Sequence, residues 1–204
     1  MFSNLFILSS FIRAKEINYS SLIINKVQIS QCLIEKAKHN DRLAQKQLYD
    51  RYAPALLSVC RLYITDLQFA EDALLKSFFK IFTNIHKYQE QEHFYAWMRR
   101  ITVNECIDFL RSKIQKTSFA DWNDTYDSPD DDPDTYPIDE ETMQSFIDKL
   151  PPACRAVFNL YVFDSYSHKQ ISTQLGITEG TSKSQLAYAK KLLKDYVTTY
   201  KKRA

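Results

Sequence analysis

The stretch LGITEGTSKSQLAYAKKLL, residues 175–193, contains both glycines of the 204-residue chain, Gly176 and Gly180. Glycine makes up about 7% of average proteins, and β-hairpins and bulges use it where the backbone needs a positive φ. A chain without glycine outside one short segment is poorly suited to hairpins, and no part of it alternates apolar and polar residues for long. The sequence therefore predicts an all-α protein.

The residues around Gly176 have the spacing of a helix-turn-helix. Ser167 and Gln170 form a capping-box pattern that opens one helix. Gly176 stands where a helix C-terminus favours a left-handed residue, and Thr178 is suited to cap the next helix. The helices expected here, joined by a turn at Gly176, cover residues 168–175 and 179–198.

The second of these helices is expected to have one buried and one polar side. The stripe predicted to be buried consists of Ser182, Leu186, Ala189 and Leu193. Serine, glutamine and lysine side chains can bond base edges or phosphates in a major groove, whereas the alternative is a solvated lysine face on an ordinary helical hairpin. The predicted DNA-contacting residues are Thr181, Lys183, Ser184, Gln185, Tyr188, Lys190 and Lys191.

Residues 31–116 show the periodicity of consecutive amphipathic helices. Pro54 is expected to interrupt or restart one of them, because proline lacks the N–H that a helix interior needs. Thr65 and Gln68, in the run TDLQ, predict the capping box of the next helix. A further helix is expected from Phe94 to Ser112.

The net charge of +2 conceals three blocks of different sign. Residues 1–116 contain 17 Lys/Arg and 11 Asp/Glu, residues 117–148 contain 11 Asp/Glu and no Lys/Arg, and residues 149–204 contain 10 Lys/Arg and 3 Asp/Glu. Two basic blocks separated by an acidic one suit contact with a polyanion at two points.

The acidic block contains Pro129, Pro133 and Pro137, which favour an extended tether over a helix. Its carboxylates could bind a cation, but it lacks the turn glycine and the glutamate spacing of an EF-hand. A metal-dependent hydrolase that used this run would also need a histidine partner, which the run does not contain. We therefore expect no enzyme activity, no metal, no cofactor and no small-molecule substrate.

Four cysteines lie far apart without a C-x-x-C pair, which predicts reduced thiols in a cytosolic protein; they are Cys32, Cys60, Cys106 and Cys154. The apolar start, MFSNLFILSSFIR, is too short to span a bilayer and lacks the basic region and cleavage site of a signal peptide. Residues 1–29 are therefore interpreted as an N-terminal extension without an assigned role.

Together these blocks resemble a bacterial sigma factor of the extracytoplasmic-function (ECF) class, within the sigma-70 family. The segment LPPACRAVFNLYVFDSYSHKQISTQLGITEGTSKSQLAYAKKLL, residues 150–193, is similar to sigma domain 4. The motif AED at residues 70–72 and the run WMRRITVNECIDFLR at residues 97–111 are similar to sigma domain 2. The organisation that this predicts is two small helical domains, at 30–114 and 139–204, with an acidic flexible linker at 115–138 between them.

The resemblance implies an RNA polymerase sigma factor, which directs core polymerase to specific promoters and helps initiate transcription. Domain 4 of such factors reads the minus-thirty-five element, and domain 2 binds the polymerase clamp helices and captures an unstacked base of the minus-ten element. The polymerase-binding residues that this implies are Asp72, Leu75, Lys76 and Phe79. The residues implied at the minus-ten element are Tyr88, Phe94, Arg99, Arg100 and Asn104.

Some of these positions have two interpretations. Phe94 and Trp97 either offer aromatic surfaces on which a base stacks or belong to the core. Asn104, Asp108 and Arg111 share a helix face and either contact DNA or form an internal hydrogen-bonded network. The acidic linker either mimics nucleic acid in a basic channel of the polymerase or is a solvated spacer.

The chain departs from the family pattern in both domains. Leu75 and Lys76 stand where Gln-Glu is usual, which puts a lysine on a face expected to be acidic. Gln185 and Tyr188 stand where arginines are common, and glutamine favours adenine edges, so a different promoter sequence is expected. The alternative function suggested by Leu75 and Lys76 is a stand-alone helix-turn-helix transcriptional regulator without polymerase binding.

The partners that the resemblance implies are core RNA polymerase, promoter DNA and an anti-sigma factor that holds the free protein inactive. The implied location is the cytoplasm, with nucleoid association during activity and with the inner membrane as a place where an anti-sigma factor could hold the chain.

Overall fold

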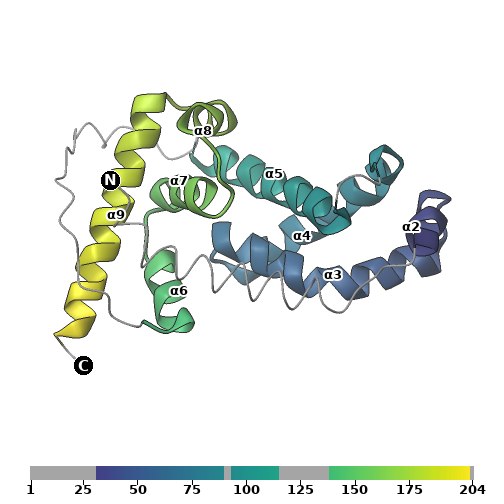
Figure 1. Cartoon of the computed structure of the whole chain (residues 1–204), viewed down its shortest axis with the longest axis horizontal. Helices are drawn as coiled ribbons and strands as arrows, with labels where there is room; N and C mark the ends of the chain where they lie inside the picture. Colours follow the sequence, from purple (N-terminus) through teal and green to yellow (C-terminus); the bar gives the residue numbers. More distant parts are fainter. Residues whose placement is uncertain (1–30, 90–92, 115–137, 203–204) are drawn as a thin grey trace. The chain divides into compact units, whose positions relative to one another are not determined.

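The computed structural model describes residues 31–89, 93–114 and 138–202. Within these ranges every regular element is a helix, so the prediction of an all-α protein is confirmed. The helices form two compact units, α2 to α5 and α6 to α9, which are described separately (Figure 1). The predicted N-terminal extension, and all of the predicted acidic linker except Ile138, lie outside the described residues.

The first unit is built from amphipathic helices whose apolar sides face one another. α2 and α4 both pack on α3, and α2 also contacts η1. The bounds are α2 Gln31–Lys38, α3 Arg42–Tyr63, α4 Leu67–Asn84, the 3-10 turn η1 Ile85–Lys87 and α5 Phe94–Ile114. Completely buried core side chains include Leu48, Tyr63, Ile81, Met98 and Ile107.

Two local predictions in this unit are wrong. The cap of α4 is Asp66 rather than Thr65, because the Asp66 carboxylate accepts a hydrogen bond from the Phe69 backbone N–H at 3.1 Å. Pro54 does not interrupt α3, which continues through it. The buried stripe that includes Tyr52 and Leu56 runs past Pro54 on the inner side, so tertiary packing outweighs the cost of a proline inside a helix, about 3 kcal/mol for the lost hydrogen bond and the ring clash together.

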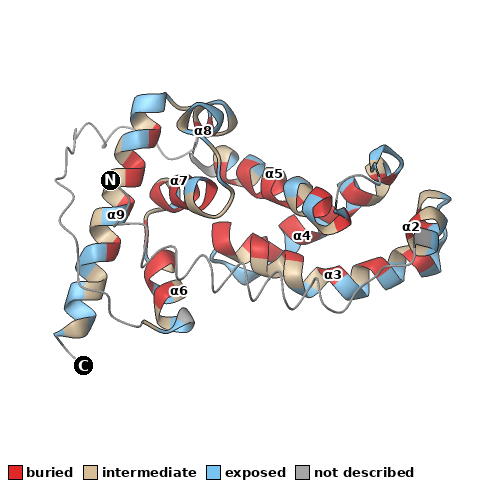
Figure 2. Ribbon diagram, viewed as in Figure 1, coloured by how far each residue is buried: buried red, intermediate tan, exposed pale blue. Residues whose placement is uncertain are grey.

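The second unit has four helices, and their observed bounds confirm the predicted segments to within three residues. These bounds are α6 Glu140–Asp148, α7 Pro152–Val162, α8 His168–Leu175 and α9 Glu179–Lys201. α7 and α8 both pack against α9. α6 contacts the later turns of α9, where the Phe146 ring meets Tyr196 and Tyr200. Figure 2 shows the buried residues of α9 on the side next to α7, with exposed residues on the opposite side.

The turn between α8 and α9 has the caps that the sequence predicts. Ser167 and Gln170 form a complete capping box, in which the Gln170 side chain accepts from the Ser167 N–H at 2.8 Å. Gly176 has φ +69° and ends α8 in the left-handed conformation. The Thr178 hydroxyl oxygen then accepts from the Thr181 N–H at 3.0 Å and opens α9. The helix-turn-helix is therefore confirmed in its local details.

Replacing each glycine by alanine should separate backbone strain from crowding. A Cβ at Gly176 would meet no atom within 4 Å, so Gly176→Ala should cost only the strain of the left-handed conformation, about 1–2 kcal/mol of the free energy of unfolding. Gly180 is helical and its Cβ would lie at an ordinary 3.6 Å from Thr178 Oγ1, so Gly180→Ala should be neutral or stabilising by up to about 1 kcal/mol. Urea denaturation of the full chain measures both, and equal effects would contradict this account.

Candidate nucleic-acid and protein interfaces

The outward side of α9 presents most of the residues predicted to contact DNA. Lys183 and Lys190 are exposed. The partly buried members of this side are Thr181, Ser184, Tyr188 and Lys191. The predicted inner stripe is confirmed, because Ser182, Leu186, Ala189 and Leu193 are all buried. α9 is thus anchored by one side and leaves a polar, lysine-bearing side open to solvent.

Gln185, which was predicted to read bases, belongs to the inner side instead. Its side chain is buried, and its Oε1 atom accepts a hydrogen bond from the Cys154 thiol of α7 at 2.8 Å. The physical reason is periodicity: Gln185 follows Ser182 by three residues and precedes Ala189 by four, so it shares their helix face. The carbonyl oxygen of Gln185 is therefore engaged within the protein, and its side chain is not on the outward side of α9.

His168 was not singled out from the sequence, yet it joins the two helices of the helix-turn-helix. Its Nδ1 atom lies 2.9 Å from the hydroxyl oxygen of Ser182, which is completely buried on α9. The ring of Tyr161 stacks on the imidazole with centroids 4.9 Å apart. Burial lowers the pKa of His168, and the positive charge of Lys183 lowers it further. A histidine at the first position of a helix gives no sequence signal for this contact.

The His168 environment predicts a pH dependence of stability. A histidine whose pKa is lower in the folded than in the unfolded chain takes up its proton more readily on unfolding, so the free energy of unfolding should fall as the pH drops below about 6.5. His168→Gln removes this titration and should flatten the profile between pH 7 and pH 5. Urea denaturation measures the free energy of unfolding of both proteins across this pH range. The other titrating groups affect the two proteins equally, so the difference between the profiles reports on His168. Parallel profiles for the two proteins would contradict the assignment.

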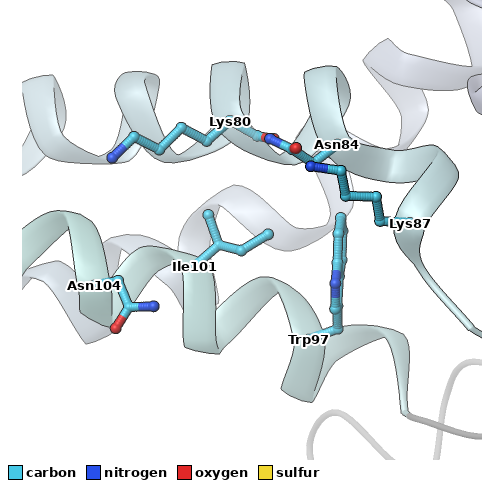
Figure 3. Close-up of a pocket in the computed structure, with 6 residues that line it drawn as sticks. All are labelled: Lys80, Asn84, Lys87, Trp97, Ile101 and Asn104. Atoms are coloured by element: carbon cyan, nitrogen blue, oxygen red, sulfur yellow. The ribbon is translucent and has the colours of Figure 1, made fainter.

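In the first unit, α4, η1 and α5 enclose a pocket of about 310 Å³ (Figure 3). The residues that line it are Lys80, Asn84, Lys87, Trp97, Ile101 and Asn104. In Figure 3, Ile101 and Trp97 project from α5 toward α4, and Lys87 and Asn84 lie opposite the far end of the indole. The Asn104 Oδ1 atom is buried and has no hydrogen-bond partner among the described residues. The pocket therefore combines an indole, amide groups and two lysines.

Phe94, which was predicted to contact the minus-ten element, lies in the core instead. Phe94 and Trp97 are each 6% exposed, so both belong to the core, and Trp97 in addition lines the pocket. The Phe94 ring packs against Tyr88 at 4.9 Å and against Tyr52 at 5.9 Å between centroids. Burial in this cluster raises the pKa of Tyr52 to about 12. Phe94 is the first residue of α5, and its buried ring packs against the rings of Tyr88 and Trp97.

The helix face that Asn104 shares with Asp108 divides into two parts. Asp108 forms an internal ion pair with Arg111 at 3.2 Å, as the network interpretation predicts. Asp108 also meets Lys80 of α4 at 3.5 Å, and Lys80 lies 2.5 Å from the carboxylate of Glu105. Asn104 lines the pocket instead of joining this network. The remaining predicted minus-ten residues lie at the surface, with Arg100 exposed and Tyr88 and Arg99 partly buried.

The outer side of α4 carries the predicted polymerase-binding residues, all of them exposed: Asp72, Leu75, Lys76 and Phe79. Leu75 and Phe79 are four residues apart on one helix face and are 57% and 73% exposed. Two large apolar side chains displayed together in this way are typical of a protein-binding surface.

Comparison with known families decides what these two units are. The family model described as Sigma-70 region 2 matches residues 48–115, and the model described as Sigma-70, region 4 matches residues 140–193. The chain belongs to the sigma-70 family. Sigma factors act in transcription initiation and are not enzymes, in agreement with the prediction from the sequence.

Curated relatives of this chain include sigma factors of the ECF class. The ECF sigma factor SigE of Mycolicibacterium smegmatis is 28% identical over 136 residues, which cover 64% of this chain and 52% of that protein. The ECF sigma factor SigM of Mycobacterium tuberculosis is 28% identical over 159 residues, 74% of this chain and 75% of SigM. The chain thus spans about half the length of the first relative and three quarters of the second.

Solved structures of similar proteins include the sigma factor RpoE in complex with the anti-sigma factor NepR from Bartonella quintana. It has a TM-score of 0.45 and 20% identity, and the match covers 75% of this chain and 96% of RpoE. Within the described ranges of this sigma factor, no helix is long and apolar enough to cross a membrane, and no group of three His, Cys, Asp or Glu side chains is placed to hold a metal ion.

Proposed function

We propose that this chain is an ECF sigma factor that directs core RNA polymerase to a specific set of promoters. The observation that carries the proposal is the presence of sigma region 2 and sigma region 4 in this order in one chain. Each region folds as a separate helical unit with an exposed surface of suitable chemistry. Tethering the two units converts two weak DNA contacts into one firm one through effective concentration.

The region 4 unit would hold the minus-thirty-five element by the outward side of α9. Lys183, which is exposed near the start of the helix, and Ser184 would meet base edges in a major groove, as the N-terminal residues of recognition helices do. Lysines further along α9 would neutralise phosphates. Because Gln185 is buried, it is removed from the residues that were predicted from the sequence to contact bases. Lys183 would therefore contribute more to the preference for one promoter sequence over another.

The region 2 unit would hold an unpaired base of the minus-ten element in the pocket between α4 and α5. The indole edge of Trp97 offers an apolar wall, and the amide groups of Asn84 and Asn104 can bond a base edge. Lys80 and Lys87 bring positive charge to the rim, which suits the phosphates on either side of the base.

The outer side of α4 would bind the polymerase through Leu75 and Phe79. Asp72 and Lys76 flank this apolar pair with one charge of each sign, so the polymerase surface should offer an apolar groove with complementary charges at its rim. An anti-sigma factor would keep the free protein inactive, at the inner membrane or in the cytoplasm, by covering the same two apolar side chains. In the active state the protein would lie at promoter DNA together with polymerase.

The direct test is run-off transcription with core polymerase on a library of genomic fragments. The proposal expects transcripts from a limited set of promoters that share two sequence elements. A protein that binds duplex DNA but neither co-purifies with core polymerase nor supports run-off transcription would instead be a stand-alone regulator.

Phe79→Asp should abolish stable binding to core polymerase, because the partner would have to bury an unpaired carboxylate in place of an aromatic ring. The matched control is Leu43→Asp on α3, since Leu43 is also 73% exposed and lies outside the proposed surface. Co-purification with polymerase, with circular dichroism to verify folding, measures both variants. Equal loss in both, or no loss in Phe79→Asp, would contradict the placement of the polymerase surface.

Substitutions of an early and a later lysine of α9 should have different kinds of effect. Lys183→Ala should change which promoters are used, whereas Lys194→Ala should weaken all promoters alike and reduce the salt dependence of binding by about one counterion. Run-off yields on a panel of promoters at several salt concentrations distinguish the two patterns. The same pattern from both variants would show that base reading and phosphate binding are wrongly assigned.

A further inference from the structure

Glu105 is a buried acidic residue in the unit that carries the pocket. The residue is 8% exposed and sits on α5 among completely buried neighbours, including Thr102 and Cys106. Burial penalises an ionised carboxylate unless an opposite charge is close. That charge is Lys80 of α4, whose Nζ atom lies 2.5 Å from Glu105 Oε2. The ion pair thus connects two helices, and no role proposed above uses Glu105.

Two carboxylates of α5, those of Glu105 and Asp108, lie close to the ammonium group of Lys80. Asp108 Oδ2 lies 3.5 Å from Lys80 Nζ, and the other oxygen of Asp108 is bonded to Arg111. The close Glu105 carboxylate raises the pKa of Lys80 most strongly, and Asp108 raises it as well, so the ammonium group is held in its charged form. A lysine side chain free in solvent samples many rotamers, whereas here its charged end is fixed against α5.

Lys80 is also a wall of the pocket, together with Asn84 of its own helix and Asn104 of the opposite one (Figure 3). Glu105 follows Asn104 in sequence but does not line the pocket. It therefore reaches the pocket only through Lys80. Its negative charge, so close to a surface that would receive DNA, opposes general attraction of phosphates. A role in increasing DNA affinity therefore does not explain a carboxylate at this position. A role in holding Lys80 in place does explain it.

We propose that Glu105 is a positioning residue for promoter recognition, which fixes Lys80 at the pocket wall so that the correct minus-ten sequence is preferred over DNA in general. This inference rests on the proposed function of the pocket. It assigns Glu105 an effect on discrimination between sequences rather than on overall DNA affinity.

A double-mutant cycle in the holoenzyme tests this. Holoenzyme is assembled from core polymerase and the full chain, and its Kd is measured for a promoter recovered by run-off transcription and for the same duplex with a scrambled minus-ten element. Lys80→Met and Glu105→Gln should each lower the ratio of the two affinities about tenfold, and the double variant should lower it no further than Lys80→Met alone. Glu105→Gln should leave binding to the scrambled duplex unchanged or tighter, because a negative charge is lost.

The matched control is the ion pair between Lys46 and Asp50, which has the same 2.5 Å separation but lies exposed on α3. Asp50→Asn should leave the discrimination ratio unchanged. If Glu105→Gln does not fold, Glu105→Leu removes the same charge and fills the buried site with an apolar side chain.

The results that would contradict the inference have three different consequences. Independent, multiplying effects of Lys80→Met and Glu105→Gln would overturn the positioning role of Glu105 alone, as would a lowered Tm for Glu105→Gln with an unchanged ratio. A wild-type ratio for Lys80→Met would overturn the assignment of the pocket and this inference with it. Absence of run-off transcription with the wild-type chain would overturn the proposed function itself.

Discussion

The packing of α9 against α7 determines which side chains of the region 4 unit face outward. Leu186, Ala189 and Leu193 are the buried apolar residues on the inner side of α9, and the hydrogen bond between Gln185 and the Cys154 thiol of α7 adds a directional contact. An apolar stripe alone tolerates some rotation of a helix, but a buried hydrogen bond is lost if the helix turns. The lysine side of α9 is therefore presented at a defined angle, as sequence reading in a groove requires.

In the region 2 unit, the helix α4 makes a different contact with each of its faces. Its inner side packs in the core through residues such as Phe78 and Ile81, its outer side displays Leu75 and Phe79, and Lys80 reaches from its edge to α5. A single rigid helix thereby connects the proposed polymerase surface to the proposed base pocket. Rigid packing between two binding surfaces allows one to influence the other only through small displacements of the whole helix.

The parts of the fold that depend on nearby residues could be predicted from the sequence. The caps at Ser167 and Thr178 and the turn at Gly176 are set by contacts within four residues, and the structure has all of them. The prediction that Pro54 interrupts the helix was wrong. Packing against residues distant in sequence decides whether this helix continues, and local propensity does not.

The candidate site was less predictable, for related reasons. The burial of Gln185 could have been inferred from its spacing to Ser182 and Ala189, but its polar character favoured a surface position. The pairing of Lys80 with Glu105 had no sequence signal, since it depends on how α4 and α5 are aligned across the unit. The contacts with DNA and polymerase depend on the surfaces of those partners. The sequence of this chain therefore identifies which exposed residues could make such contacts, and the order of their importance is set by the partners.

The burial of Cys154 has a practical chemical consequence. Burial raises the pKa of its thiol to about 12, so at neutral pH it is a neutral hydrogen-bond donor rather than a nucleophilic thiolate. Cys60 and Cys106 are likewise buried, which leaves Cys32 on α2 as the accessible sulfur among the four cysteines, all of which fall in the described ranges. A maleimide dye would accordingly attach at one position of the native protein, giving a fluorescent reporter on the region 2 unit without any engineered cysteine.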